Sequence, residues 1–533
     1  MDSIIDNVNA YVVPFFTSEQ SQRLFHRHRV SISAAVTLIT TYALYTSITT
    51  VPRKLAHIPH LGFFDYIKAM MDRKPIDEVS KELTIPAGNK SDSGLYVRFD
   101  RDGWTIHVIR PEAAKRLLFK TDIFPKADRS HTFGTLFGRM LGTRHIGSLT
   151  GAPWKAHRKI ANPAFHGTMP VNMFGQLSIK LFGVMDELCK VGPIDIHDAT
   201  ERWTLDALGL AAFDFDFNAV GDKNSEWVTR YKTVMSATFE PLYLMLPKLD
   251  TWFLPLNATR KQKHAECDSL LNMIDDIIAA KRQMLKNKKQ PSNTDEHEEK
   301  DVLTMMIEAE NSGQGIMSDE ELRNNMVIFF IAGHDTTANA LAGIAYELAV
   351  NPDVQAKARE EAIRVLGDAP EDVIPTAEQW SQMPYIHQAI KENLRVHPPA
   401  ASTLARTTSQ DTELAGTFIP KGSKVVLDIY ELHHNPKVWS DPDTFKPERF
   451  APGGEAEQLA GQGMPWLPFI NGQRQCLGMN FSLAEQRTLL PMLLRKYELS
   501  LPENSVHKNG LSTKGLVLGV QPNDLQIVFK PRY

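Results

Sequence analysis

A ten-residue loop near the C-terminus, FINGQRQCLG at residues 469–478, constrains this chain more than any other stretch. It presents Cys476 between Gly472 and Gly478, just ahead of an apolar run that predicts a helix. The dipole and free amides of a helix N-terminus favour a thiolate at such a position. Without its neighbours, Cys476 would be interpreted first as an inert buried thiol, because free cysteine is among the most buried residue types.

The neighbours favour a thiolate that binds a metal. No second cysteine stands nearby, so the metal would have to bring its other ligands with it, as the iron of haem does with its porphyrin. Glycines on both sides leave room for a flat ligand beside the backbone. Arg474 suits a haem propionate, which it can hold through a charge-assisted contact.

The other cysteines and the overall charge exclude several classes of protein. Cys189, Cys267 and Cys476 are far apart and odd in number, with no C-x-x-C pair and no C-x-x-C-H sequence. This pattern argues against a disulfide framework, a cysteine-rich zinc or iron–sulfur site and a c-type haem, and it suits a reducing compartment. Because the net charge is −4 and no basic stripe or zinc-finger pattern appears, no nucleic-acid partner is expected.

An uncharged segment at residues 30–51 predicts a single membrane anchor. If helical, it is about 33 Å long, which matches the hydrocarbon core of a bilayer. Nine of its residues are Ser or Thr, so an interfacial or a packed core helix is an alternative. The predicted division is an N-terminal extension (1–29), the anchor (30–51), a proline-containing connector (52–64) and a catalytic domain (65–533).

Periodicity predicts a mainly α fold with small β-sheets. The expected elements are helices at 186–210 and 262–284, strands at 94–99 and 105–109, a hairpin at 412–430 that turns at Pro420 and Gly422, and a polar surface loop at 286–301.

The longest predicted helix starts at Ser318, whose SDEE sequence is a capping box, and runs without proline to Asn351. Its apolar first half predicts burial, yet AGHDTT at 332–337 follows in its middle. A kinked core helix with a satisfied aspartate is one interpretation. The other is a proton relay, because a buried acid beside a hydroxyl is what proton delivery requires.

A second group of charges is predicted around residues 384–399. Glu392 and Arg395 lie on one face of a helix that begins at Pro384. Such a pair alone means little, because exposed helices carry many. Arg449, in the proline-stiffened segment 442–450, could complete a buried network with them, and that network would specify geometry more than stability.

Five motifs in one order resemble the cytochrome P450 superfamily. The loop matches F-x-x-G-x-R-x-C-x-G at every fixed position, namely Phe469, Gly472, Arg474, Cys476 and Gly478. The chain also resembles the family in its oxygen-activating segment (AGHDTT, 332–337), E-x-x-R pair (ENLR, 392–395), meander (PERF, 447–450) and W-x-x-x-R (WKAHR, 154–158). The N-terminal anchor is similar to that of microsomal eukaryotic members, and the sequence as a whole is similar to those of filamentous-fungal members.

This resemblance implies a fold with haem b between the long central helix and the helix after the cysteine loop. It implies that Cys476 is the axial ligand of the iron, that Asp335 and Thr336 deliver protons to dioxygen, and that Phe469 shields the sulfur. The residues implied to hold the propionates are Trp154, Arg158, Arg406 and Arg474. Glu392, Arg395 and Arg449 would lock the fold behind the haem.

The implied function is a monooxygenase that hydroxylates a steroid, terpenoid or fatty-acid-like molecule at the endoplasmic reticulum membrane, with its catalytic domain in the cytosol. Electrons would come from NADPH through a separate cytochrome P450 reductase, with cytochrome b5 as a further possible partner, because the chain has no dinucleotide fingerprint. The pocket is expected to be apolar and lined by Ala332, Ala400, Ala401, Ser402, Thr403 and Leu404. A non-oxygenating isomerase or dehydratase and a catalytically silent haem protein are the alternatives.

Overall fold

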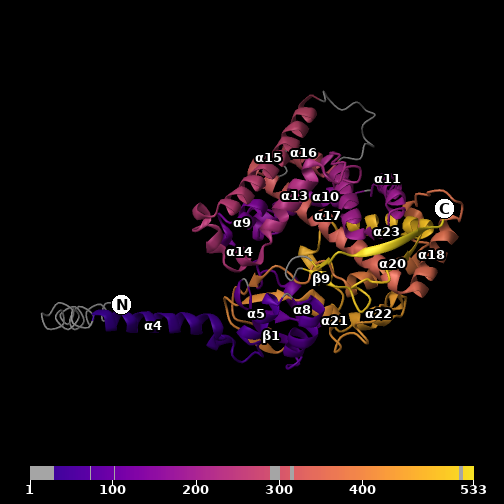
Figure 1. Cartoon of the computed structure of the whole chain (residues 1–533). Helices are drawn as coiled ribbons and strands as arrows, with labels where there is room; N and C mark the ends of the chain where they lie inside the picture. The colour runs from indigo at the N-terminus through magenta and orange to yellow at the C-terminus, as the bar shows by residue number, and fades with distance from the viewer. Residues whose placement is uncertain are drawn as a thin grey trace.

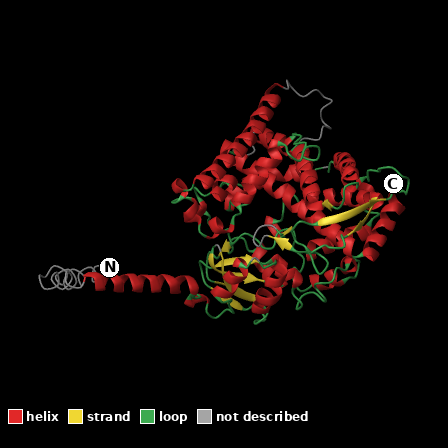
Figure 2. Cartoon of the chain, viewed as in Figure 1, coloured by secondary structure: helices red, strands yellow, loops and turns green. Residues whose placement is uncertain are grey.

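The computed structural model describes residues 29–72, 74–100, 102–167, 169–287, 301–311, 317–514 and 520–533. Helices dominate these ranges and the strands form small sheets, so the expected fold class is confirmed. Figure 2 shows one group of strands in the lower part of the molecule and another near the C-terminus. The N-terminal extension and most of the polar loop expected at 286–301 lie outside the described residues.

The helices differ widely in length. The longer helices are α5 (Phe63–Met71), α8 (Pro111–Phe119), α10 (Gly151–His166), α11 (Val171–Cys189), α12 (Ile196–Leu208), α13 (Glu226–Thr238), α15 (Ala258–Asn287), α16 (Val302–Asn311), α17 (Asp319–Val350), α18 (Pro352–Leu366), α20 (Pro384–Val396) and α23 (Met479–Lys496). The shorter ones are α6 (Ile76–Val79), α7 (Ile85–Gly88), α9 (Leu136–Leu141), α14 (Pro241–Met245), α19 (Ala377–Trp380), α21 (Ile429–His434) and α22 (Glu455–Ala460).

The strands are β1 (Leu95–Asp100), β2 (Gly103–Val108), β3 (Ile194–Asp195), β4 (Arg406–Thr407), β5 (Thr412–Leu414), β6 (Thr417–Ile419), β7 (Lys424–Leu427), β8 (Tyr497–Ser500), β9 (Thr513–Lys514), β10 (Gln521–Pro522) and β11 (Gln526–Pro531). The largest sheet has the order β1-β2-β7-β4, in which only β2 and β7 are parallel. Smaller sheets pair β3-β11-β8, β5-β6 and β10-β9.

Helix α17 passes through the centre of the body, and its predicted start and end are confirmed (Figure 1). Ser318 caps it and forms both hydrogen bonds of a capping box with Glu321. Three acids in its first turn favour the positive end of the helix dipole. It packs against α12, α15, α20 and α23, so its middle is buried between elements from both halves of the chain.

Two predicted elements were wrong in detail. The helix expected at 186–210 is two helices, because α11 ends at Cys189 and α12 begins at Ile196, with Gly192 and Pro193 between them. The hairpin expected at 412–430 turns at Ala415 and Gly416, where β5 meets β6, while β7 pairs with β2 and β4 instead. The Gly-Pro signal in the first segment was overlooked, and in the second the turn residues did not reveal the partner strands, which tertiary packing selects.

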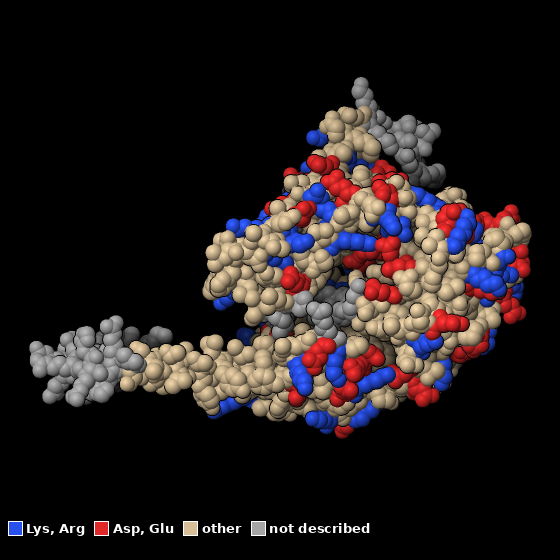
Figure 3. Space-filling view, viewed as in Figure 1, with Lys and Arg blue, Asp and Glu red and all other residues tan. Residues whose placement is uncertain are grey.

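Helix α4 (Arg29–Thr49) projects from the body as a separate rod (Figure 1). Figure 3 shows its projecting surface free of Lys, Arg, Asp and Glu, whereas both signs of charge are mixed over the body. The segment Ser33–Leu55 is long and apolar enough to cross a membrane, with a mean hydropathy of 1.3. The indole of Trp104 donates to the carbonyl oxygen of Ile48 at 3.0 Å, so the end of α4 is fixed to the β1–β2 hairpin.

Candidate active site

The cysteine loop is closed by its own backbone. The amide of Cys476 donates to the carbonyl oxygen of Phe469 at 3.0 Å, and a 3₁₀ turn at Gly472–Arg474 lies between them. Gly478 is the N-cap of α23, so the thiol stands just ahead of a helix N-terminus, as expected. Ile470 adopts φ +48°, a left-handed conformation that costs a β-branched residue on the order of 1–3 kcal/mol. The backbone of the cysteine loop is therefore strained at Ile470, and the surrounding protein has to hold it in this conformation.

The glycines have different tasks from those the sequence suggests. Gly472 has φ +75°, and a Cβ there would lie at ordinary contact distance from Leu118 and Phe119, so the backbone angle and not space for a ligand requires glycine. Gly333 admits the side chain of Leu208 from α12, at 2.8 Å from an added Cβ, and not a cofactor. A Cβ at Gly478 would meet no atom within 4 Å, so only this position leaves open space beside the cysteine.

The Cys476 thiol is solvent-accessible yet surrounded by protein on most sides. Burial raises its pKa, while a hydrogen bond from the Gly478 amide and the nearby Arg158 guanidinium lower it by less. The amide at the helix N-terminus therefore favours the thiolate, as expected, but burial outweighs it. The sulfur needs a further positive partner, such as a metal ion, to stay deprotonated at neutral pH.

Cations gather beside the cysteine without carboxylates. Burial together with the charges of Arg406 and Arg158 lowers the pKa of Arg474 to about 10, and burial alone lowers that of Arg406 to about 10. Lys126 has a pKa well below its usual range because it is buried beside Arg406 and Arg474. Among the described residues, none of these four side chains forms an ion pair with an Asp or Glu. The cluster is therefore built for an anion.

Two of the predicted propionate ligands are already fixed in place. Arg474 lies over the ring of Trp154 at 4.0 Å from its centroid and donates to the carbonyl oxygen of Leu149 at 2.7 Å. Arg158 donates to the carbonyl oxygen of Gln475 at 2.9 Å, which ties α10 to the cysteine loop. Trp154 thus contacts the arginine face directly, and its aromatic ring restricts the guanidinium more than a backbone bond alone would.

The polar middle of α17 presents two faces. Ala332 is exposed although the helix around it is buried, and the Thr336 hydroxyl, one turn later on the same face, donates to its carbonyl oxygen at 2.8 Å. Thr337 donates to Ser482 of α23 at 2.9 Å, and this bond fixes α17 to the helix that follows Cys476. Ala332 and Thr336 thereby line the opening beside the cysteine helix.

Asp335 lies on the other face of α17, away from Thr336, because adjacent helical residues point in different directions. Its Oδ2 accepts a hydrogen bond from the Tyr231 hydroxyl of α13 at 2.6 Å, and its Oδ1 is 3.0 Å from His334 Nε2. Burial alone would raise the pKa of Asp335, but His334 and Tyr231 hold it below its ordinary value. The expected acid–hydroxyl pair is present in sequence but is not in contact.

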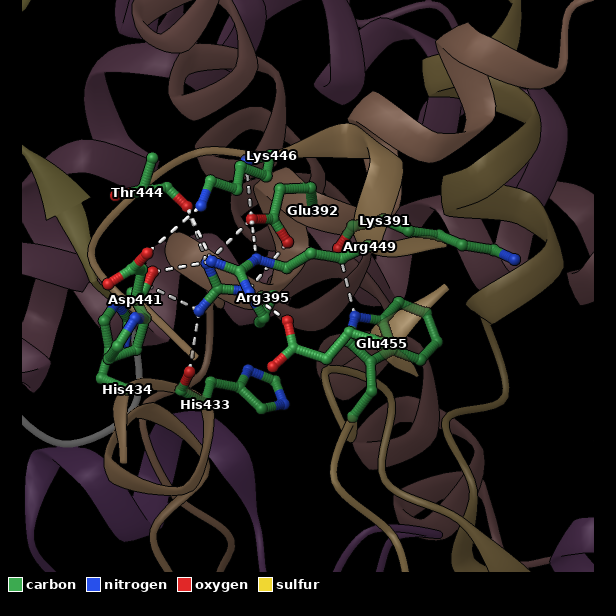
Figure 4. Close-up of polar contacts among 12 residues, drawn as sticks. Lys391, Glu392, Arg395, His433, His434, Asp441, Thr444, Lys446, Arg449 and Glu455 are labelled. Atoms are coloured by element: carbon green, nitrogen blue, oxygen red, sulfur yellow. Dashed lines mark hydrogen bonds and ion pairs between the residues drawn. The ribbon is translucent and has the colours of Figure 1, made fainter. Parts of the chain in front are cut away.

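The charges predicted around α20 do meet (Figure 4). Arg395 forms two hydrogen bonds of 2.8 Å with the carboxylate of Glu392, and Arg449 Nε donates to the same carboxylate at 3.1 Å. Arg395 also donates to the carbonyl oxygens of His433 and Pro442. All three charged side chains are fully buried, so the network ties α20 to the coil that runs toward the cysteine loop.

The site thus combines a thiol ahead of a helix N-terminus, a cluster of buried cations beside it, and the helix α17 with its polar middle. The family model described as cytochrome P450 matches residues 98–527.

The chain belongs to the cytochrome P450 family.

Several curated cytochrome P450 proteins match over most of their length. Cytochrome P450 4A11 of Homo sapiens is 29% identical over 406 residues, which is 75% of each chain. Cytochrome P450 3A29 of Sus scrofa is 30% identical over 469 residues, 86% of this chain and 88% of the relative. Cytochrome P450 4F5 of Rattus norvegicus is 31% identical over 373 residues, 67% of this chain and 68% of the relative. The suggested likeness to filamentous-fungal members stays a prediction.

Membership of the cytochrome P450 family makes the protein a monooxygenase whose cofactor is haem with a thiolate-bound iron. The residues present fit this group. The cations around Arg474 call for an anion, which the two haem carboxylates would supply, and the buried Arg406 Nε has no hydrogen-bond partner in the described part of the chain. The accessible thiol and the open side of Gly478 fit a flat iron-bearing ring.

The residues expected to line a cytochrome P450 substrate pocket are only partly open to one. Ala400, Ser402, Thr403 and Leu404 are half-buried. Ala401 is buried and packs with Ile76, Tyr430 and Val520. The Thr403 hydroxyl accepts from the Leu427 amide at 3.1 Å, which attaches this segment to the end of β7. Thr403 therefore has a structural bond, and Ala332 remains the most open of the six.

Sequence reasoning missed Lys126, Tyr231 and His334. Lys126 stands in an extended segment with no motif, and only its bridge to Arg406 places it in the cation cluster. Tyr231 carries no signal of its own, because its contact with Asp335 spans two helices that are distant in the sequence. His334 stood inside the AGHDTT motif, and its position beside the acid was the signal that could have identified it.

Proposed function

We propose that this cytochrome P450 is an anchored enzyme of the endoplasmic reticulum that hydroxylates a steroid, terpenoid or fatty-acid-like molecule. The single observation that supports the site is the acid-free cation cluster of Lys126, Arg158, Arg406 and Arg474 beside the Cys476 thiol. No other arrangement among the described residues joins an accessible thiol to an anion site. Helix α4 supports the anchor, and the catalytic domain is residues 65–533.

In this proposal Cys476 is the thiolate ligand, and Arg158, Arg406, Arg474 and Trp154 hold the carboxylates. When bound, the haem supplies the electron transfer and the activation of dioxygen. Phe469 closes the loop behind the sulfur through its carbonyl oxygen.

The remaining roles belong to α17 and the buried network. The Thr336 hydroxyl, which now donates to Ala332, turns toward the opening to place a proton there. Asp335 holds the proton supply behind it. Glu392, Arg395 and Arg449 keep α20 and the coil in register with the cysteine loop and take no part in the chemistry.

Electrons are proposed to come from NADPH through a separate cytochrome P450 reductase, with cytochrome b5 as a second donor. Lys155 and Lys159 are exposed on α10, on the same helix as Arg158, and offer a docking face for an acidic partner.

The proposed function is tested with purified full-length protein, haem and NADPH–cytochrome P450 reductase. A screen of steroids, terpenoids and fatty acids by substrate-induced spin shift should identify ligands, and the ligand with the largest shift should be hydroxylated with consumption of NADPH and dioxygen. A rearranged or dehydrated product formed without NADPH would contradict hydroxylation. A normal thiolate spectrum with no product from any class would contradict the enzyme role.

Replacing Thr336 with alanine should uncouple electron use from product. The Thr336 hydroxyl lies one turn after Ala332 and donates to its carbonyl oxygen, so its loss removes a proton donor from this side of α17. We expect the fraction of NADPH recovered as product to fall about tenfold or more, with peroxide released instead.

Thr336→Ser keeps the hydroxyl and is the matched variant for this test. It should recover most of the coupling. Equal coupling in wild-type protein and in Thr336→Ala would refute the assignment.

Haem loading should depend on pH. Because burial raises the pKa of Cys476 above its ordinary value, the sulfur is a thiol at neutral pH and must release a proton when it binds iron. Apparent affinity should therefore rise about tenfold for each pH unit, up to the pKa of the thiol. Titration of apoprotein with haem between pH 6 and 8 measures this slope, and a flat profile would contradict thiol protonation.

A further inference from the structure

A second cluster of titratable groups lies where α17 meets α12 and α13. His334 and Asp335 come from α17, Glu201 from α12 and Tyr231 from α13. The ligand atoms of Glu201, His334 and Asp335 all lie within 4.8 Å of one another. His334 is fully buried, and Tyr231 packs over its ring with the two centroids 4.7 Å apart.

The hydrogen bonds of His334 fix which nitrogen can exchange a proton. Its Nδ1 donates to the carbonyl oxygen of Phe330 at 2.7 Å, so Nδ1 keeps its hydrogen. The other nitrogen, Nε2, is 3.0 Å from Asp335 Oδ1 in the geometry of an ion pair rather than an aligned hydrogen bond. Protonation and deprotonation therefore occur at Nε2, the atom that faces both carboxylates.

This cluster has an opening to the surface. Glu201, Tyr231, Lys232 and His334 line a small cavity between α12 and α13, whose room for water is about 10 Å³, close to that of one molecule. Lys232 is exposed and forms ion pairs with Asp198 at 2.7 Å and Glu201 at 3.2 Å. The polar groups thus run from solvent to Glu201, and from Glu201 to His334 and Asp335.

We propose that Glu201 and His334 are the proton entry of this monooxygenase, which carry protons from solvent to Asp335 along the α12–α13 side. The inference rests on the proposed function. Oxygen insertion consumes one O₂, two electrons and two protons for each product and water formed, so the acid must be reloaded in every turnover. Each proton that Asp335 gives up is replaced through His334 Nε2, which is itself reloaded from Glu201, and Glu201 takes its proton from solvent.

The charges around His334 support this direction of transfer. Burial opposes a charge on His334, but Asp335 and Glu201 outweigh it and raise its pKa above the ordinary value. The charged groups that face the pair are His197, Asp198, Glu201 and Arg202 from α12 and Tyr231 and Lys232 from α13. The stored proton therefore resides on the imidazole, and Asp335 stays ionised between deliveries.

The same three ligand atoms could be considered for a metal ion, but their bonds favour a proton. Asp335 already accepts from Tyr231 and pairs with His334. Because the pKa of His334 is raised, its Nε2 carries a proton more of the time, and this proton competes with a metal ion for the nitrogen.

The test compares His334→Gln and Glu201→Gln with wild-type holoenzyme and reductase. We expect each variant to keep the reduced-CO spectrum and the substrate-binding constant, to lose product formation by about tenfold, and to show a larger solvent isotope effect on that rate. His397→Gln is the matched control. His397 also pairs with a carboxylate of α17, that of Glu347 at 2.6 Å, but Glu347 is twelve residues after Asp335 in this helix. It should match wild type in all three measurements.

A readout independent of turnover is the NMR titration of ¹⁵N-histidine-labelled protein, with His334 assigned by its absence in His334→Gln. The pKa of His334 should fall in Glu201→Gln, because a negative charge that favours the imidazolium is lost. If His334→Gln fails to fold, Glu201→Gln decides the question. The proton entry would be overturned if Glu201→Gln showed the same product rate, isotope effect and histidine titration as the wild type. If the wild-type enzyme formed no product but the titration shift appeared as expected, only the proposed function would be refuted.

Discussion

Cys476→Ser is expected to abolish product formation while the protein still folds. Cys476 is exposed and serine is close to cysteine in size, so the change acts on the iron and not on the core. Serine is a far weaker donor to haem iron than a thiolate. We expect the thiolate-type reduced-CO band to disappear and turnover to fall by more than about 10³-fold, which corresponds to ~4 kcal/mol of barrier.

Cys189→Ser provides the control for this experiment. Cys189 is a half-buried cysteine at the end of α11, and its replacement should leave both the spectrum and turnover unchanged. Retention of the thiolate-type band in Cys476→Ser would show that another residue binds the iron.

Glu392→Gln is expected to prevent the accumulation of folded holoprotein. The change leaves the buried guanidinium groups of Arg395 and Arg449 without their shared carboxylate, and breaking such a buried network costs about 3–5 kcal/mol. That is a large part of the total stability of a typical folded protein. Denaturant unfolding and the yield of haem-loaded protein measure the effect.

The neighbouring Glu448→Gln is the matched control. Glu448 forms an ion pair with Lys357 in which both side chains are exposed, and such pairs contribute about 1 kcal/mol or less. It should unfold at nearly the wild-type denaturant concentration. Equal stability of the two variants would mean that the buried network does not specify the fold.

Features with a strong local signal could be predicted from the sequence. The capping box at Ser318 and the absence of proline identified α17 correctly, and Pro384 identified the start of α20. The motifs identified the family, because each fixed residue is tied to one chemical task. The meeting of Glu392, Arg395 and Arg449 could only be suggested, since nothing in the sequence distinguishes a buried pair from an exposed one.

Features set by tertiary contacts could not be predicted. The hairpin turn was misplaced because β7 pairs with β4 and with β2, and β2 is far away in the chain. The neighbour of Gly333 could not be identified either, because it is Leu208 of α12, which is more than a hundred residues away in the chain. The contact between Asp335 and Tyr231 could not be predicted for the same reason, because Tyr231 lies on a helix that no motif connects to α17.

The acid-free cations around Arg474 link the abundance of this protein to the supply of its cofactor. Like charges that are buried together repel one another, so the polypeptide is least stable until an anion neutralises them. A ligand that binds only the folded state stabilises it in proportion to the logarithm of its free concentration. In cells short of iron or porphyrin, proteolysis would therefore remove more of this chain, and the supply of haem would set its level after translation.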